Sequence, residues 1–248
     1  MILLLLAAGR GSRMEGYTDN INKCLLIVND FPIIHYSLKI AKTLPITKAI
    51  IVVGYQAEKV IEYINLGTWP FPIEFVFQNE QKGIVHAMQK AFPLLNEDVL
   101  LNLSDEILIK SNINSMIESF YKDKPDFICG VMHNCSAKKI QKAYSITLNE
   151  DGKITKVLEK PEFPQNSICG TGYCIFKHDI LKYLYNVPLN VIRNQYELCD
   201  YINLLIQKNK TGYTYNVGEE LININTIDDL NIIKDKFRKS SMKMNYEK

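Results

Sequence analysis

Near its N-terminus the chain reads Ile2-Leu-Leu-Leu-Leu-Ala-Ala-Gly9-Arg10-Gly11-Ser12-Arg13-Met14. The run from Ile2 to Ala8 is apolar at every position, which is typical of a parallel strand buried on both faces. In an open α/β sheet, ligands bind beyond the carboxyl ends of such strands. Glycines and arginines follow directly, and backbone N–H groups together with guanidinium groups suit an anion such as phosphate. The alternative is a plain strand-to-helix turn with surface arginines.

Two well-known phosphate loops do not fit this segment. A P-loop needs the pattern GxxxxGK[ST], which is absent from the sequence. A dinucleotide-binding loop needs GxGxxG, and Met14 stands where the third glycine belongs. A nicotinamide-dependent oxidoreductase is therefore a weaker alternative than another kind of phosphate-binding enzyme.

Strand-like and helix-like patterns alternate through the first half of the chain. Strands are expected at residues 2–8, 49–53, 73–77 and 99–103, and helices at residues 32–41, 57–64 and 83–92. Repeated strand–helix alternation predicts a parallel sheet with helices on both of its faces.

The second half of the chain has a different pattern. A hairpin is expected at Asp151-Gly152, between strands at 144–148 and 153–158. Further strands are expected at 172–176, 214–217 and 221–224, and helices at 195–207 and 226–237. The predicted fold class is α/β, with a Rossmann-like, mostly parallel sheet, helices on both faces and antiparallel additions in the C-terminal half. We expect a single domain over residues 1–240 and a basic tail over residues 241–248.

Composition and charge argue against several classes of protein. Apolar residues make up 47% of the 248 positions and the net charge is +2, so binding of nucleic acid through bulk charge is not indicated. The apolar run Ile2–Ala8 is far shorter than the roughly 20 residues of a membrane span, and no basic region precedes it as in a signal peptide. The six cysteines form no CxxC pair, and the four histidines lack metal-ligand spacing. We expect a cytoplasmic protein with no zinc, nucleic-acid or membrane partner.

Five further segments accompany the glycine loop in the sequence. They are Gln78-Asn-Glu-Gln81-Lys-Gly83-Ile-Val-His-Ala87, Leu101-Asn-Leu-Ser-Asp105, Val157-Leu-Glu159-Lys160-Pro161, Gly170-Thr-Gly172-Tyr-Cys-Ile-Phe176 and Ile222-Asn223-Ile-Asn225-Thr226-Ile-Asp-Asp-Leu230. With the loop and Lys23, they resemble in the same order the motifs of the nucleotidyltransferases that activate sugar phosphates, also called pyrophosphorylases. The resemblance covers roughly residues 1–235 and implies a nucleotide-diphospho-sugar transferase-like fold.

This resemblance implies a reaction and a set of site residues. An NMP group would pass from an NTP to the phosphate of a small phosphorylated metabolite, with release of pyrophosphate and with Mg²⁺ as cofactor. The implied catalytic residues are Arg13, Lys23 and Lys160, and the implied metal ligands are Asp105 and Asn225. The implied nucleotide-binding residues are Leu6, Ala7, Ala8, Gly9, Gly11, Ser12, Arg13, Gln78, Gln81, Gly83 and Ser104. The implied acceptor-binding residues are Glu159, Lys160, Thr171, Gly172 and Glu197.

Two positions depart from the family's pattern. Ser104 replaces the glycine that usually precedes the metal-binding Asp105, and Glu106 follows it. The second metal ligand is usually Asp, whereas here the candidates are Asn223 and Asn225, of which the spacing to the closing helix favours Asn225. The missing negative charge is expected to weaken metal binding. It also keeps open a non-catalytic regulatory subunit with the same fold.

The donor and the acceptor follow less directly from the sequence. The Ala7-Ala8-Gly9 form of the loop resembles cytidylyl- and uridylyl-transferring relatives more than the Ala-Gly-Gly form of many thymidylyl- and guanylyl-transferring ones. We therefore expect a cytidylyltransferase that uses CTP, with dTTP, UTP or GTP as alternative donors. A sugar 1-phosphate, a phospho-alcohol or a similar metabolite is expected as acceptor, in cell-envelope or capsule building. A homodimer is the expected assembly.

Overall fold

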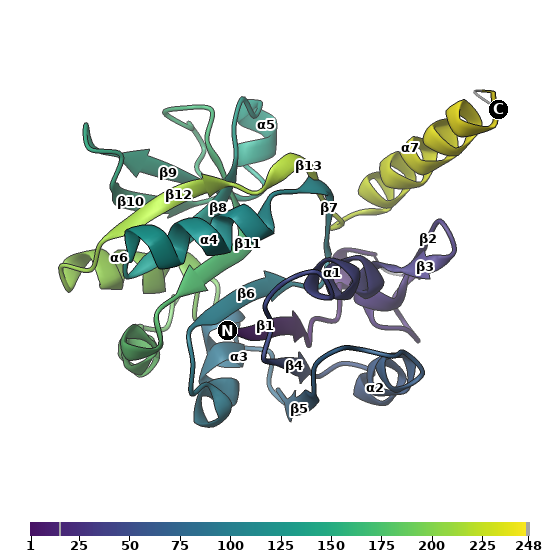
Figure 1. Ribbon diagram of the computed structural model, residues 1–248, viewed down its shortest axis with the longest axis horizontal. Helices are drawn as coiled ribbons and strands as arrows, with labels where there is room; N and C mark the ends of the chain where they lie inside the picture. The colour runs from purple at the N-terminus through teal and green to yellow at the C-terminus, as the bar shows by residue number, and fades with distance from the viewer. Residues whose placement is uncertain (15, 247–248) are drawn as a thin grey trace.

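The computed structural model describes residues 1–14 and 16–246, with side chains described up to residue 238 (Figure 1). Its nine-stranded sheet has the order β10-β9-β11-β6-β1-β4-β5, with β8 paired to β11 and β12 paired to β8. The four mutually parallel strands are β6 (Val99–Leu103), β1 (Ile2–Ala7), β4 (Lys48–Val53) and β5 (Ile73–Phe77). The helices are α1 (Ile33–Ala41), α2 (Ala57–Asn65), α3 (Ile84–Ala91), α4 (Ile113–Asp123), α5 (Ala137–Ile140), α6 (Leu198–Gln207) and α7 (Ile227–Tyr246). The α/β prediction and its parallel half are confirmed.

Alternate side chains of β1 face two separate hydrophobic cores. Leu4 lies in the core that also contains apolar residues of α3 and α6. Leu3 and Leu5 lie in the core on the opposite face, with apolar residues of α1, α2 and α4. Each of these leucines is at most 1% exposed. Burial of such a side chain contributes about 1.5–3 kcal/mol, which explains why no polar residue interrupts the strand.

The C-terminal half extends the sheet mainly with antiparallel strands. The strands there are β8 (Phe127–Met132), β9 (Tyr144–Leu148), β10 (Ile154–Glu159), β11 (Cys169–Phe176) and β12 (Gly212–Asn216). β9 and β10 form the predicted hairpin, and β11 is antiparallel to both β6 and β8. β12 is parallel to β8. The predicted antiparallel additions are therefore present, although helix α4 and strand β8 lie in a stretch for which the sequence pattern predicted no element.

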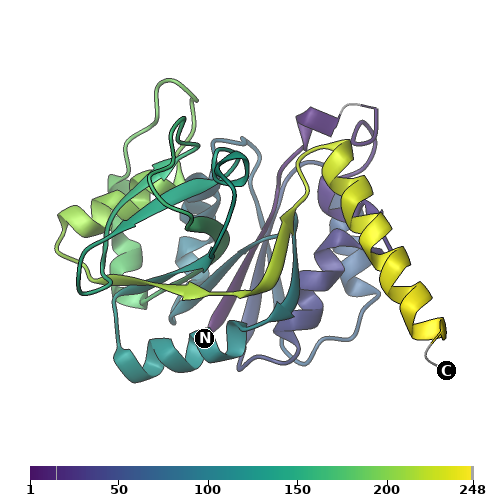
Figure 2. The same cartoon turned by 90° about the horizontal axis from the view of Figure 1, so that it is seen from above.

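Two strands outside the main sheet connect its C-terminal half to the closing helix. β7 (Glu106–Ser111) and β13 (Gly218–Asn223) are antiparallel, with Asn223 directly opposite Glu106. Figure 2 shows the yellow-green chain of β12 and β13 running from the C-terminal half across to α7. The start of α7 packs through Leu230 and Ile233 against the core around the hairpin of β2 (Ile27–Val28) and β3 (Phe31–Pro32).

Helix boundaries differ from the predicted ones at two places. α6 begins at Leu198 instead of residue 195. The backbone of Glu197 is extended, Tyr196 N donates to Lys82 O (2.8 Å) and Tyr196 O accepts from Val85 N (3.0 Å). α7 continues to Tyr246, into the predicted basic tail, whose residues 247–248 lie outside the described residues.

Short 3-10 helices complete the fold at η1 (Ser12–Met14), η2 (Lys23–Leu25), η3 (Phe92–Leu94) and η4 (His178–Asn186). Over the described part of the chain, we find no helix with the length and apolar character that crossing a membrane requires.

Candidate active site

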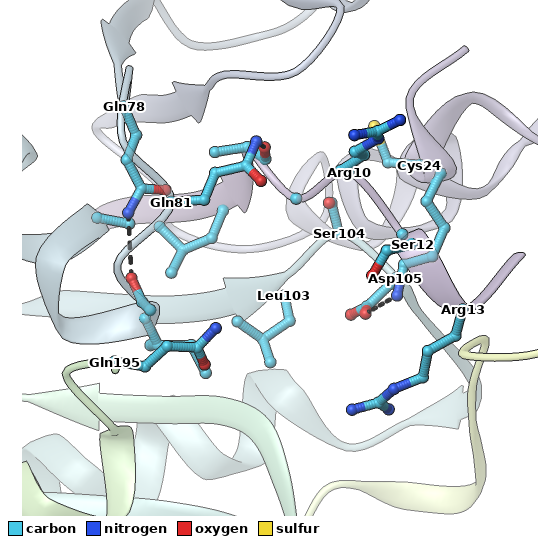
Figure 3. A pocket seen from close by; sticks show the side chains of 18 of the residues that line it. Arg10, Ser12, Arg13, Cys24, Gln78, Gln81, Leu103, Ser104, Asp105 and Gln195 are labelled. Atoms are coloured by element: carbon cyan, nitrogen blue, oxygen red, sulfur yellow. Dashed lines mark hydrogen bonds and ion pairs between the residues drawn. The ribbon is translucent and has the colours of Figure 1, made fainter. Parts of the chain in front are cut away.

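Two adjoining cavities open beyond the carboxyl ends of β1 and β6. The larger has a volume of about 710 Å³ and the smaller about 370 Å³, and both are lined by Lys23, Asp105 and Lys160. Figure 3 shows Gln78 and Gln81 at one end of the larger cavity and Asp105 and Arg13 at the other. Ten of the eleven predicted nucleotide-binding residues line this cavity: Leu6, Ala8, Gly9, Gly11, Ser12, Arg13, Gln78, Gln81, Gly83 and Ser104. Ala7 does not, because its side chain is 1% exposed and lies in the core beneath the loop.

Asn22 and Gly11 fix the position of Lys23 beside the glycine loop. The Asn22 side chain donates to Ala7 O (2.9 Å) and Tyr55 O (2.8 Å) and accepts from Cys24 N (3.0 Å). These bonds join η2, which begins at Lys23, to the end of β1. Gly11 has φ +71°, and a Cβ there would lie 2.9 Å from Lys23 Cβ. A glycine is therefore required for the lysine to pack against the loop.

Hydrogen bonds fix the side-chain amides of Gln78 and Gln81 at one end of the larger cavity. Gln78 Nε2 donates to Gly83 O (3.1 Å) and lies 3.0 Å from Nδ1 of His86. Burial, reinforced by Lys90 and Lys82, lowers the pKa of His86, which favours the neutral ring as an acceptor. Gln81 Nε2 donates to Ala8 O (2.8 Å). One N–H of the Gln81 amide is thus bonded to the loop, and the amide oxygen and the second N–H are left for a ligand.

Gly83 begins α3 in a conformation that only glycine adopts readily. Its φ is +95°, and a Cβ would lie 2.7 Å from Tyr196 O. Tyr196 belongs to the segment before α6, so the close approach at Gly83 brings the two walls of the larger cavity together.

Of the two predicted metal ligands, Asp105 lines both cavities and Asn225 lines the smaller one. Lys23 Nζ lies 2.5 Å from Asp105 Oδ2 and donates to Asn225 Oδ1 at 3.2 Å. Asp105 lies in the turn between β6 and β7, and Asn225 lies two residues before the start of α7. A cationic group therefore stands between the two oxygens that were expected to bind Mg²⁺.

The residues present fit a magnesium ion. One carboxylate oxygen and one amide oxygen are hard ligands of the kind that Mg²⁺ prefers, and the ion commonly completes its coordination with substrate phosphates and water. Within residues 1–14 and 16–246 there is no cluster of three or more His, Cys, Asp or Glu side chains that could hold a metal. Asp105 and Asn225 would therefore hold the ion together with the phosphates of a bound nucleotide.

The predicted acceptor residues lie around a guanidinium group that the sequence pattern did not single out. Arg193 Nη1 lies 3.1 Å from Glu159 Oε1 and 3.4 Å from Glu197 Oε1. Lys160 Nζ lies 3.4 Å from the same oxygen of Glu159. Burial, reinforced by Glu159, raises the pKa of Glu197. The only sequence signal for Arg193 was its position four residues before Glu197, which by itself is common.

Thr171 and Gly172 form the wall of the smaller cavity, with their polar groups bonded inside the protein. Thr171 Oγ1 donates to Gly130 O at 2.9 Å. Gly172 N donates to both carboxyl oxygens of Glu106, each at 3.0 Å. Glu106 is 2% exposed, and burial, reinforced by Asp105, raises its pKa to about 8. In the sequence, Glu106 stands out only as a departure from the family's pattern. In the structure, its carboxyl group holds the backbone of Gly172 in the wall of the smaller cavity.

Comparisons with known proteins agree with this geometry. Residues 2–220 match the family model described as nucleotidyl transferase. The chain is 31% identical over 215 residues to UTP–glucose-1-phosphate uridylyltransferase AglF of Haloferax volcanii, covering 85% of this chain and 86% of that protein. It is 28% identical over 241 residues to the bifunctional protein GlmU of Thermodesulfovibrio yellowstonii, covering 94% of this chain and 51% of GlmU. The chain thus spans about half the length of that second relative.

The fold is shared with solved structures at lower sequence identity. A crystal structure of UDP-glucose pyrophosphorylase complexed with UDP-glucose superposes with a TM-score of 0.86 at 20% identity, covering 96% of this chain and 98% of the other. This likeness confirms the predicted nucleotide-diphospho-sugar transferase-like fold. The match of residues 2–220 to the family model, with the 31% identity to AglF, establishes that the chain belongs to the nucleotidyl transferase family.

Proposed function

We propose that this nucleotidyltransferase transfers a uridylyl group from UTP to a sugar 1-phosphate and releases pyrophosphate. The observation that carries the choice of base is the orientation of Gln81. Its Nε2 donates one N–H to Ala8 O at 2.8 Å, which holds the side chain at the loop and leaves its amide oxygen as an acceptor for the base. An acceptor oxygen pairs with the N3–H of uracil, whereas N3 of cytosine is itself an acceptor and only the neighbouring 4-amino group donates. The expected preference for CTP is therefore replaced by the alternative donor UTP, with dTTP sharing the same base edge.

The relatives support the same choice of donor. AglF carries the name of a UTP-dependent glucose-1-phosphate enzyme and aligns with 85% of this chain. The cytidylyl preference rested on the short loop Ala7-Ala8-Gly9, a form that also resembles uridylyl-transferring enzymes.

The proposed chemistry is an in-line displacement at the α-phosphorus. An oxygen of the acceptor phosphate attacks, the bond from phosphorus to the pyrophosphate oxygen breaks, and pyrophosphate leaves. The phosphate oxygen is already ionised near neutral pH, so no protein base is required. Arg13 and Lys23 bind the triphosphate, and the rate enhancement comes from positioning and charge neutralisation. Mg²⁺ held by Asp105 and Asn225 would offset the negative charge of the phosphate oxygens.

The acceptor is proposed to bind in the smaller cavity. Carboxylates accept hydrogen bonds from sugar hydroxyl groups, and Glu159 and Glu197 both line this cavity. Lys160 lines both cavities and is placed to bind the acceptor phosphate between them. Its φ of +45° and the bond from its N to Ala143 O (2.7 Å) hold its backbone in this position. A sugar 1-phosphate matches this combination of carboxylates and a cation better than a phospho-alcohol without hydroxyl groups.

Thermal unfolding with Mg²⁺ and each of UTP, dTTP, CTP, GTP and ATP tests the choice of donor. A ligand at 100 times its Kd adds about 2.7 kcal/mol to the free energy of unfolding, or roughly 5–10 °C in Tm for a chain of this size. We expect UTP or dTTP to give the largest shift. The same shift with CTP would contradict the base assignment, and no shift with any nucleotide would favour a non-catalytic subunit. The single domain over residues 1–240, cytoplasmic location, homodimer and envelope pathway stay predictions.

A further inference from the structure

Asn223 lies between a buried carboxyl group and the amide of the second proposed metal ligand. Its Nδ2 donates to Glu106 Oε1 at 3.4 Å. Its Oδ1 accepts from Asn225 Nδ2 at 2.8 Å. The pairing of β7 with β13 places Asn223 opposite Glu106, although 117 residues separate them in the sequence.

The direction of these hydrogen bonds is set at the Glu106 end. Glu106 Oε1 accepts from both Gly172 N (3.0 Å) and Asn223 Nδ2. It can do so as an oxygen of a carboxylate or as the carbonyl oxygen of a protonated carboxyl group. Asn223 must therefore present its NH₂ group to Glu106 and its oxygen to Asn225. Asn225 in turn directs its NH₂ group to Asn223, and its oxygen points at Lys23 Nζ, 3.2 Å away.

An asparagine ligand needs this kind of orientation, whereas an aspartate does not. The two ends of an amide differ, and only the oxygen can bind a cation, so a reversed Asn225 would present NH₂ to the ion. Hydrogen bonds from neighbouring residues commonly fix the orientation of metal ligands. The backbone of Asn225 is held separately, because Asp229 Oδ2 accepts from Asn225 N (3.1 Å) and Thr226 N (2.9 Å). Only the side-chain amide depends on Asn223.

We propose that Asn223 is a positioning residue that turns the amide oxygen of Asn225 toward the divalent cation. Glu106, itself anchored on the acceptor wall through Gly172 N, sets the direction. This inference rests on the proposed function because it requires a metal at Asp105 and Asn225. It gives Asn223, one of the two candidates for the second metal ligand, a role beside Asn225 instead of a contact with the ion.

A double-mutant cycle tests this role by measuring Mn²⁺ binding to the full chain by EPR at saturating UTP, without an acceptor, so that no turnover occurs. In an otherwise unsubstituted chain, Asn223→Leu is expected to weaken Mn²⁺ binding at least about tenfold. This is the lower end of the effect of removing a residue that hydrogen-bonds to a metal ligand. In the Asn225→Asp background, Asn223→Leu is expected to change Mn²⁺ affinity less than about threefold, because either carboxylate oxygen can bind the ion. Asn216→Leu, at the end of β12, serves as the matched control, since Asn216 lies outside both cavity linings.

The possible outcomes separate this inference from the proposed function. Equal Mn²⁺ affinities of the unsubstituted chain and Asn223→Leu would overturn the positioning role and leave the metal site intact. Equal losses in both backgrounds would also overturn it, because they would indicate general damage to the site. No protein-bound Mn²⁺ with the unsubstituted chain and UTP would overturn the metal site itself, and the inference with it.

Discussion

The ammonium group of Lys23 lies 2.5 Å from Asp105 Oδ2, at the charged end of the larger cavity. The two residues are 82 positions apart in the sequence and come from the segments after β1 and β6, which are adjacent parallel strands. A bound triphosphate brings a larger negative charge to the same place, where Lys23 can bind it. The ion pair therefore holds the lysine where it can bind the nucleotide.

Replacement of Lys23 by methionine tests this role. Lys23→Met keeps most of the packing against Gly11 but removes the charge, so we expect kcat/KM for UTP to fall roughly 100-fold, which corresponds to about 2.7 kcal/mol. Steady-state pyrophosphate release measures the effect. Lys59→Met is the control, because Lys59 lies outside both cavity linings and binds the backbone at Asn20 O. Similar rates for the two variants would remove Lys23 from the site.

Asp105→Asn should reduce the rate at least about tenfold, a barrier increase of roughly 1.4 kcal/mol. The physical reason is that two amides would then face the cation with no negative charge from the protein. The defect should shrink as Mg²⁺ concentration rises, so a titration of rate against Mg²⁺ distinguishes weak metal binding from lost chemistry. Asp123→Asn on α4 provides a control outside both cavity linings. An unchanged Mg²⁺ dependence would rule out Asp105 as a ligand.

The base preference should respond to Gln81. Gln81→Met has a similar length but no hydrogen-bonding groups, so it should lose the proposed bond to N3–H and the bond to Ala8 O. We expect kcat/KM to fall about tenfold or more with UTP and to fall less with CTP. Competition between the two nucleotides in one reaction measures the ratio. If UTP and CTP lose equally, Gln81 does not select the base.

Gly83→Ala should destabilise the fold more than Gly152→Ala does. Both glycines have positive φ, +95° and +76°, which costs a residue with a Cβ about 1–2 kcal/mol. At Gly152 a Cβ meets nothing within 4 Å, whereas at Gly83 it lies 2.7 Å from Tyr196 O. We therefore expect an additional loss at Gly83, visible as a Tm lower by several degrees than that of Gly152→Ala. Equal Tm values would show that the contact with Tyr196 adjusts freely.

The buried carboxyl group of Glu106 should make stability depend on pH. Its pKa is raised from 4.5 to about 8 in the folded chain, first by burial and then by Asp105. Between these values the folded state keeps a proton that the unfolded state has released. This contribution to the free energy of unfolding is therefore complete below pH 4.5 and is lost as pH rises through 8, with a slope of at most about 1.4 kcal/mol per pH unit.

Glu106→Gln provides the comparison, because the amide does not titrate. Denaturant unfolding at pH 5 and pH 8 should show a smaller decrease for the variant than for the unsubstituted chain. Parallel decreases would mean that Glu106 titrates alike in the folded and unfolded states.

The parallel half of the fold and the core of the site were predictable because their signals are local. β1 is a continuous apolar run, and Gly9 and Gly11 follow it at once. Gln81 and Asp105 likewise lie just after strands that the pattern identifies. Parallel strands bring their carboxyl ends to one edge of a sheet, so residues distant in sequence converge there without further information.

The remaining parts depend on contacts that no local pattern specifies. β7 is a strand because it pairs with β13, more than a hundred residues later. Arg193 reaches Glu159 from a segment without a motif. The start of α6 is delayed because the backbone of Tyr196 is bonded to Lys82 O and Val85 N. The proposed role of Asn223 could not be predicted from the sequence for the same reason, because its partner Glu106 is its neighbour only in the folded chain.

The most direct test of the proposed function is pyrophosphate release from UTP, dTTP, CTP, GTP or ATP in separate reactions, each with Mg²⁺ and glucose 1-phosphate as the acceptor. The orientation of Gln81 predicts the highest kcat/KM with UTP or dTTP, at least about tenfold above CTP, which corresponds to about 1.4 kcal/mol of discrimination. A highest rate with CTP would contradict the assignment of the base. No release with any of the five nucleotides would contradict the proposed transfer to this sugar phosphate.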